Sequence, residues 1–369
     1  MAVTTILHVI TGLDIGGAEK FLCRLIAVPQ REIRHVVVSL SGRGKLASDM
    51  EAAGIDVHTP PRLGVLNAFS MMAFLRRLAK KENVDLVQSW LYKADLFATL
   101  CFSGSGIPVL WNVRQTNIGY RFNSLSNLFC LRVLRLLSRF TAHTIVYCAT
   151  ASRLVHEAIG YNKAKSWVIP NGIDVQRFNP APERDSERPL VINVARYDPQ
   201  KGQADFIHCA QRIMENRSDI RFQMVGRGVD QDNSELVRLI RDCGLTDHIE
   251  LLGERPDIPE LLNRANLFLS CSHGEGFPNA LAEAMACGLL CVATRVGDTE
   301  LLLEGIGDSC DAGDIEALAE SVCRLMDLST ERRKELEADA RNRIVEDFSV
   351  EKSASLYADL YHSVARTNR

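Results

Sequence analysis

Residues 267–288, LFLSCSHGEGFPNALAEAMACG, contain the pattern that decides the fold. The apolar run Leu267–Ser270 has the length of a buried strand, and Ala280–Cys287 is an Ala-rich run with helical character. Pro278 suits the first turn of that helix, and Gly288 suits its end. A strand, a glycine-containing loop and a helix form one βα unit of a parallel sheet.

The same alternation continues on both sides of this unit. Other strand-like runs lie at Ile6–Ile10, His35–Leu40, Leu86–Gln88, Val109–Val113, Thr144–Tyr147, Leu190–Val194, Ile220–Val225, Ile249–Leu252 and Leu290–Ala293. Helical patterns separate them at Ala18–Ala27, Ala68–Lys80, Ser126–Phe140, Ala204–Arg217, Ser234–Cys243 and Ile315–Leu328. Repeated alternation of this kind predicts an α/β fold with two doubly wound, Rossmann-like domains. Nearly continuous apolar strands agree with sheets that are covered on both faces.

The segment Asn179–Pro189 separates the two series, because its three prolines stand among charged residues. We therefore expect an N-terminal domain at residues 1–170 and a C-terminal domain at 171–349. A last helix within 350–369 is expected to cross back to the N-terminal domain. Two such domains are expected to face each other across a cleft, because ligands of open parallel sheets bind outside the carboxyl ends of the strands.

The composition is that of an ordinary globular protein, with 46% hydrophobic and 24% charged residues in a chain of 369. No apolar run reaches the roughly 18 residues that a membrane span requires. The 11 Cys show no repeated metal-type pairing, so reduced thiols and a cytoplasmic location are expected.

Charge is unevenly distributed along the chain. Residues 1–170 carry 20 Lys and Arg against 10 Asp and Glu, a formal +10, and the rest carries −13. Within the basic half, Arg132, Arg135 and Arg139 fall on one side of an otherwise apolar helical pattern. Such a helix either lies on an anionic membrane or packs on the core with a solvated basic stripe, and both interpretations stay open. The sequence contains no nucleic-acid recognition motif, so no nucleic-acid partner is expected.

Polar residues follow two of the predicted strands in the second half. Arg196 and Lys201 come after Leu190–Val194, where two cations suit a diphosphate or are simply solvated loop charges. Glu275 lies in the glycine-flanked loop and Glu283 lies inside the next helix. These carboxylates suit the hydroxyls of a sugar and a ribose, or are an ordinary loop acid and helix acid.

Two further motifs are less specific. Gly16 and Gly17 follow the first strand, where they permit close approach of an anion to a helix N-terminus or form only a tight turn. Asp230 and Asp232 form an Asp-x-Asp triplet, which we interpret as a capping region before Ser234 and not as a metal site.

Together these motifs resemble the signature of the family 4 retaining glycosyltransferases, the glycosyl transferases group 1, which have the GT-B fold. The resemblance rests on Glu275-x7-Glu283 with Gly-Phe-Pro-Asn inside it. It is supported by motifs that occur in the expected order, namely Gly16-Gly17-Ala18-Glu19, Val168–Asp174, Arg196 with Lys201-Gly202, and Val225-Gly226-Arg227-Gly228.

The resemblance implies a metal-independent hexosyltransferase that retains configuration. Its donor would be a nucleotide-sugar, in particular a UDP-sugar, and its acceptor a glycan or a lipid-linked glycan of polysaccharide or lipopolysaccharide biosynthesis. The nucleotide-sugar is a substrate, so no cofactor is expected. The implied catalytic residues are Glu275, Arg196 and Lys201. The implied donor-binding residues are Gly16, Gly17, Arg196, Lys201, Gly226, Arg255, Glu275, Gly276, Phe277, Pro278, Asn279 and Glu283.

The N-terminal half departs from the family pattern. Many relatives have a His after a strand of this domain, whereas Trp90-Leu91-Tyr92-Lys93 and Trp111-Asn112-Val113-Arg114 contain none. Lys93 and Arg114 are the candidate contacts to an acceptor or a phosphate. Two alternatives remain, a nucleotide-sugar 2-epimerase of the same fold and a non-catalytic nucleotide-sugar-binding regulator. The donor sugar and the acceptor stay open.

Overall fold

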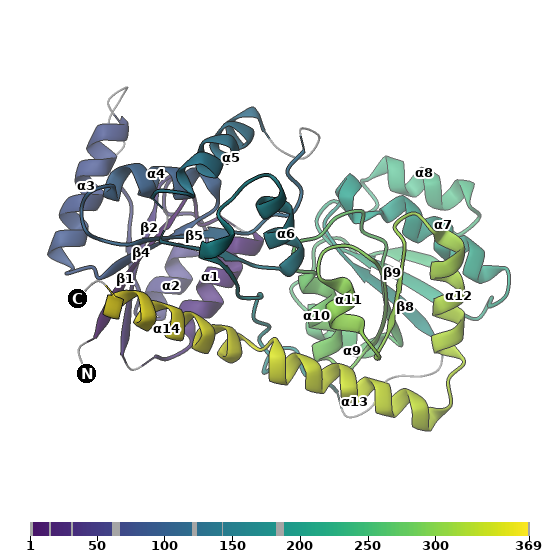
Figure 1. The fold of residues 1–369 in the computed structure, drawn as a ribbon. Coiled ribbons are helices and arrows are strands. Elements are labelled where there is room, and N and C mark those ends of the chain that lie inside the picture. Colours follow the sequence, from purple (N-terminus) through teal and green to yellow (C-terminus); the bar gives the residue numbers. More distant parts are fainter. Residues whose placement is uncertain are drawn as a thin grey trace. The chain divides into compact units, whose positions relative to one another are not determined.

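The computed structural model describes residues 3–14, 16–30, 32–60, 67–119, 124–141, 143–181 and 188–367. The chain divides into two compact units, which we call the first unit (residues 1–172 with 350–369) and the second unit (residues 173–349). Each unit contains one parallel sheet with helices against it (Figure 1). The predicted α/β fold with two Rossmann-like domains is confirmed. Part of the predicted linker, residues 182–187, lies outside the described residues.

The first unit has a seven-stranded sheet in the order β3-β2-β1-β4-β5-β6-β7. Its strands are β1 (Thr4–Ile10), β2 (Ile33–Ser39), β3 (Asp56–His58), β4 (Leu86–Trp90), β5 (Val109–Val113), β6 (Thr144–Tyr147) and β7 (Ser166–Val168). Its helices are α1 (Gly17–Ala27), α2 (Ala47–Ala52), α3 (Asn67–Lys81), α4 (Tyr92–Phe102), α5 (Leu125–Leu137), α6 (Thr150–Ala158) and α14 (Val350–Thr367).

The second unit has a six-stranded sheet in the order β10-β9-β8-β11-β12-β13. Its strands are β8 (Leu190–Val194), β9 (Arg221–Val225), β10 (Ile249–Leu251), β11 (Leu267–Ser270), β12 (Leu290–Thr294) and β13 (Asp308–Cys310). Its helices are α7 (Gln203–Met214), α8 (Ser234–Asp242), α9 (Ile258–Arg264), α10 (Asn279–Ala286), α11 (Thr299–Leu303), α12 (Ile315–Met326) and α13 (Thr330–Asp347).

The central strand β1 shows why its sequence is apolar throughout. Ile6 and Ile10 belong to one hydrophobic core together with α1 and α14, whereas Leu7 and Val9 belong to another together with α3, α4 and α5. Because successive side chains of a strand point to opposite faces, a sheet covered on both faces needs apolar residues at every position.

The C-terminal helix α14 belongs to the first unit, although it follows α13 of the second unit directly in sequence. It lies beside α1, β1 and β4 (Figure 1). The Tyr357 hydroxyl accepts a hydrogen bond of 2.8 Å from the Asn112 side chain, and Ser353 donates to the Pro170 carbonyl at 2.9 Å. Within the described ranges, no helix combines the length and apolarity that crossing a membrane requires.

Candidate functional site

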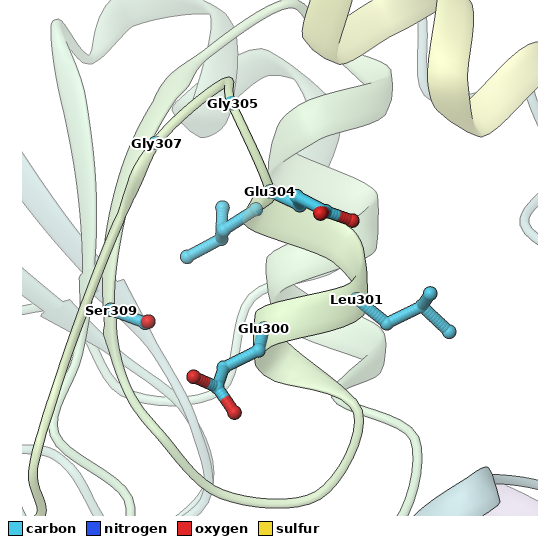
Figure 2. A pocket seen from close by; sticks show the side chains of 7 residues that line it. Glu300, Leu301, Glu304, Gly305, Gly307 and Ser309 are labelled. Atoms are coloured by element: carbon cyan, nitrogen blue, oxygen red, sulfur yellow. The ribbon is translucent and has the colours of Figure 1, made fainter.

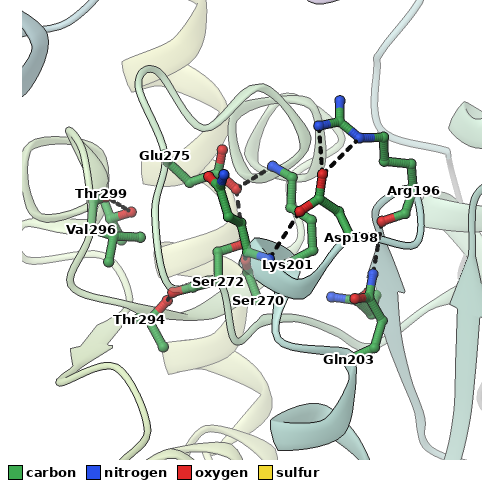
Figure 3. Close-up of polar contacts among 12 residues, drawn as sticks. Arg196, Asp198, Lys201, Gln203, Ser270, Ser272, Glu275, Thr294, Val296 and Thr299 are labelled. Carbon is green, nitrogen blue, oxygen red and sulfur yellow. Dashed lines mark hydrogen bonds and ion pairs between the residues drawn. The ribbon is translucent and has the colours of Figure 1, made fainter. Parts of the chain in front are cut away.

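The loop between β11 and α10 carries Glu275 at the carboxyl end of the second sheet. Glu275 Oε1 accepts hydrogen bonds from Lys201 Nζ at 2.6 Å and from Ser272 Oγ at 2.8 Å (Figure 3). Lys201 reaches this point from the connection between β8 and α7, because β8 and β11 are neighbours in the sheet. Only 15% of the Glu275 side chain and 23% of the Lys201 side chain are exposed, so the ion pair is largely shielded from water.

Arg196 lies in the same connection between β8 and α7 but is more exposed to solvent than Lys201. Its guanidinium forms an ion pair of 2.8 Å with Asp198, and 59% of the side chain is exposed. Asp198 also caps the 3-10 turn Pro199–Lys201 by accepting from the Gln200 amide at 3.0 Å. The sequence indicates no protein anion beside Arg196 or Lys201. In the structure each of these two cations pairs with a carboxylate of the protein.

Glycines bring these strand-end loops close together. Gly202 has φ +63°, and a Cβ at this position would overlap the carbonyl oxygen of Cys271 in the Glu275 loop. Gly226, which follows β9, has φ +151°, and a Cβ there would overlap the Ala195 carbonyl. Both positions combine a conformation that favours glycine with backbone-to-backbone contact, so the glycine motif after β9 has a packing reason that is independent of any ligand.

The remaining residues of the motif separate into core and surface positions. Phe277 is only 3% exposed and packs against Phe348, with 5.7 Å between ring centroids, so its side chain belongs to the core. Pro278 is the N-cap of α10 and not a residue of its first turn, because the helix begins at Asn279. Glu283 is half-buried within α10, and Arg255, after β10, pairs with Asp257 at 2.6 Å.

The first unit has a polar cavity at the carboxyl ends of β1, β2, β4 and β5. Its volume is about 280 Å³, and it is lined by Thr11, Gly12, Asp14, Glu19, Ser41, Leu91, Tyr92, Lys93, Gln115 and Asn127. Gly16 is the N-cap of α1, and the Glu19 carboxylate occupies the space where a Cβ of Gly16 would lie. Partial burial raises the pKa of Glu19, since burial disfavours the charged carboxylate. Gly17 opens α1 and has open space around its α-carbon.

Lys93 lies in a helix, whereas Arg114 lies in the loop that follows β5. Only Leu91, with φ +72°, connects β4 to α4, so Lys93 is an exposed residue in the first turn of α4. Arg114 lies over the Phe21 ring at 4.3 Å from its centroid and donates to the side-chain oxygens of Asn112 and Asn171. Aromatic ring faces and amide oxygens thus surround the Arg114 guanidinium. The sequence did not predict either kind of contact.

Sequence reasoning also missed Ser272, Asp198 and the cavity residues Asp14, Gln115 and Asn127. The only signal for Ser272 was its place three residues before Glu275 in one loop. Asp14, Gln115 and Asp198 follow strands and Asn127 lies in the first turn of α5, but nothing local distinguishes any of them as a site residue.

Another cavity in the second unit, of about 350 Å³, is a poor candidate for an anionic ligand. It lies along α11 and is lined by Glu300, Leu301, Leu303, Glu304, Gly305, Gly307 and Ser309 (Figure 2). None of these lining residues is basic, and two are acidic. The lining therefore supplies no cation to a diphosphate.

The Asp-x-Asp triplet forms a turn before α8. Asp230 accepts from the Asp232 amide at 3.2 Å, and the helix cap is Asn233, which accepts from the Leu236 amide. In the part of the chain that the structure describes, His, Cys, Asp and Glu side chains do not gather in a group of three or more that could hold a metal ion.

Comparison with known proteins agrees with this arrangement. Residues 15–177 match the family model for Glycosyltransferase Family 4, and residues 188–327 match the model for Glycosyl transferases group 1. The chain belongs to the family 4 glycosyltransferases. This family membership confirms the resemblance drawn from the motifs.

Two curated relatives of this family 4 chain have names that describe glycosyltransferases acting on lipid-linked substrates. One is UDP-Gal:alpha-D-GlcNAc-diphosphoundecaprenol alpha-1,3-galactosyltransferase of Escherichia coli, 26% identical over 81% of this chain and 80% of that protein. The other is N,N'-diacetylbacillosaminyl-diphospho-undecaprenol alpha-1,3-N-acetylgalactosaminyltransferase of Campylobacter jejuni, 26% identical over 67% of this chain and 68% of that protein. Among solved structures, Anabaena HepE in complex with UDP has a TM-score of 0.86 at 23% identity and covers 98% of this chain and 100% of its own. The fold is GT-B.

Proposed function

We propose that this protein is a retaining glycosyltransferase that transfers a sugar from a UDP-sugar to a glycan or lipid-linked acceptor of cell-surface polysaccharide or lipopolysaccharide. The observation that carries the proposal is the Glu275–Lys201 pair at the carboxyl end of the second sheet. A carboxylate for sugar hydroxyls and a cation for phosphate stand side by side there. The UDP named for HepE and for the E. coli relative supports the choice of nucleotide.

In this proposal the second unit binds the donor. Lys201 and Arg196 contact the diphosphate, since each cation retains N–H donors beyond those used by its carboxylate partner. Glu275 accepts from the transferred sugar and Glu283 from the ribose. Gly276 and Asn279 contribute backbone N–H groups, Gly226 permits close approach of the loop after β9, and Arg255 lies near the base.

The chemistry needs no metal in this scheme. Breaking the bond between the sugar and the phosphate leaves negative charge on the diphosphate, which Arg196 and Lys201 stabilise. Retention follows from substitution on one face of the sugar, with the leaving phosphate taking the proton of the acceptor hydroxyl. The new glycosidic bond replaces the bond to phosphate, so the products are the glycoside and the protonated nucleoside diphosphate.

The first unit binds the acceptor in this proposal. Its polar cavity contains Asp14 and Glu19 as acceptors for hydroxyl groups and Lys93 as a donor. Gly16 and Gly17 form the turn beside that cavity. Arg114, held by Phe21 and two amides, precedes the cavity residue Gln115 and is the second candidate contact to an acceptor or a phosphate.

We also propose that the first unit contacts an anionic membrane through α5, on the inner face of the cytoplasmic membrane. Leu125, Phe129, Leu136 and Phe140 recur at intervals of four and seven residues and are between 60% and 79% exposed. They therefore form one apolar stripe along α5 and the turn after it. The exposed Arg132, Arg135 and Arg139 flank this stripe. An apolar stripe beside cations matches the boundary between lipid headgroups and chains.

The proposed activity is tested by thermal shift of the full chain against UDP-, GDP- and ADP-sugars, followed by NMR of the product. We expect stabilisation by one UDP-sugar, and an α-linked product from an α-linked donor. An inverted anomer would contradict retention, and no shift with any nucleotide-sugar would contradict the donor site. Conversion of the donor to its 2-epimer without an acceptor would favour the epimerase alternative. Binding without turnover in the presence of lipid-linked acceptors would favour the regulator.

A further inference from the structure

The Glu275 carboxylate is held asymmetrically. Both of its hydrogen bonds, from Lys201 and from Ser272, end on Oε1 (Figure 3). Among the described residues, no side chain or amide bonds to Oε2. One oxygen of the carboxylate is thus fixed by the protein and the other is left for a ligand.

The direction of the hydrogen bonds from the serines follows from their chemistry. A carboxylate only accepts, so the single hydroxyl proton of Ser272 is donated to Glu275. Ser270 Oγ lies 3.3 Å from Ser272 Oγ and must then be the donor of that contact. The result is a short chain of hydrogen bonds from Ser270 through Ser272 to Glu275.

Ser272 is itself firmly placed. This residue is 2% exposed, and its carbonyl accepts a hydrogen bond from the hydroxyl of Thr294, the last residue of β12. Gly297, in the connection that follows β12, supports the same loop. Its φ is +60°, and a Cβ there would overlap the Gly276 carbonyl. The hydroxyl of Ser272 is therefore part of a packed support and not a mobile surface group.

Binding of a nucleotide-sugar would affect the hydrogen bonds of Lys201 and of Ser272 to Glu275 differently. An incoming diphosphate competes with Glu275 for the Lys201 ammonium, because both are anions. A buried neutral hydroxyl bonded to a carboxylate meets no such competition. When Lys201 turns toward the phosphates, Ser272 remains the group that holds Oε1.

On the basis of the proposed function, we infer that Ser272 is a positioning residue for the transfer reaction. Its hydroxyl, supported by Ser270, holds Oε1 of Glu275 so that Oε2 accepts a hydrogen bond from a hydroxyl of the donor sugar. Ser272 acts through Glu275 and does not itself touch the substrate.

The test compares Ser272→Ala with the wild type and with Ser353→Ala, a matched buried serine of the first unit whose hydroxyl bonds to the Pro170 carbonyl. The readouts are kcat/KM and the dissociation constants of UDP and of the UDP-sugar that stabilises the wild type most. For Ser272→Ala we expect kcat/KM to fall about 10- to 100-fold, the range for loss of a hydrogen bond to a charged group. Affinity for UDP should stay within about twofold, and Ser353→Ala should match the wild type.

A second measurement separates positioning from loss of structure. In a Glu275→Ala background, Ser272→Ala should not weaken UDP-sugar binding any further, because the group it positions is absent. Equal weakening of UDP and UDP-sugar by Ser272→Ala, or an additive loss in the Glu275→Ala background, would overturn the inference in favour of a structural role. Wild-type activity in Ser272→Ala would overturn it outright. Failure of the wild type to bind any UDP-sugar would instead contradict the proposed function.

Discussion

The two sheets of this protein arrange their first six strands in the same order but differ in the connection that follows the fourth strand along the chain. In the first unit β4 pairs with β1, and a single residue, Leu91, leads from β4 to α4. In the second unit β11 pairs with β8, and residues 271–278 lead from β11 to α10. Only the longer connection has room for a glycine-flanked carboxylate, so equal topology does not give equal chemistry at the two strand ends.

Charge reinforces this difference. In the second unit Lys201 and Arg196 each have a carboxylate partner beside the strand ends, which suits a polar site that exchanges one anion for another. In the first unit Arg114 is held between aromatic rings and amide oxygens. Aromatic rings and amide oxygens thus surround the cation of Arg114, whereas Lys201 and Arg196 each pair with a carboxylate.

The largest expected effect concerns Glu275. Glu275→Gln keeps the size of the side chain but removes its charge, so kcat/KM for transfer should fall about 100- to 1,000-fold, on the order of 3–4 kcal/mol. Steady-state kinetics with the preferred UDP-sugar measure this. The comparison variant is Lys93→Met, at the equivalent strand end of the first unit, which should lower kcat/KM less. A larger loss in Lys93→Met would reverse the assignment of the donor chemistry to the second unit.

A smaller effect is expected at Lys201. Lys201→Met should weaken UDP binding about 10- to 100-fold, since it removes a cation from the proposed diphosphate contact. Isothermal titration with UDP measures the change. Lys334 is exposed on α13, and Lys334→Met is the matched control that should bind UDP like the wild type. Equal losses in both variants would mean that Lys201 contributes only general charge.

The two units should also differ in how their stability changes at acidic pH. Burial lowers the pKa of His156 in the first unit to about 4, so folding favours the neutral ring. A histidine in the unfolded chain has a pKa near 6.5. The contribution of His156 to the free energy of unfolding is therefore fully present above pH 6.5 and is lost as the pH falls from 6.5 toward 4. Between pH 7.5 and 5.5 the wild type should lose about 1.4 kcal/mol more stability than His156→Gln.

Tryptophan fluorescence during urea unfolding measures this loss, because Trp90, Trp111 and Trp167 all lie in the first unit. His208→Gln, at an exposed position on α7 of the second unit, is the control and should keep the pH dependence of the wild type. An unchanged pH dependence in His156→Gln would contradict the role of its burial.

The smallest expected effect concerns the membrane. Arg139→Gln should reduce binding to vesicles of phosphatidylcholine with phosphatidylserine about fivefold, or about 1 kcal/mol. Arg241→Gln, in an exposed position on α8 of the second unit, should leave binding unchanged. Co-sedimentation at low and high salt measures both. Equal binding of the wild type to vesicles without phosphatidylserine would contradict the proposed contact of α5.

Much of the fold was predictable from local patterns. The runs Val109–Val113, Thr144–Tyr147 and Leu267–Ser270 coincide with β5, β6 and β11, because buried strands are apolar at every position. Local patterns do not predict the helix α13, since its sequence is largely polar, or the helix α4, because its apolar residues show no helical period. Short edge strands such as β3 and β7 carry too few residues for a pattern.

The sequence by itself determined which residues stand at the ends of the strands, including Arg196, Lys201 and Glu275, because strand periodicity and turn residues are local properties. Only the tertiary structure decided that Lys201 meets Glu275, 74 residues further along the chain, and that Ser272 holds the same oxygen. It also decided that α14 returns to the first unit and that Arg114 lies against Phe21. Such contacts depend on the order of strands in a sheet and on the packing of side chains, and neither leaves a periodic trace in the chain.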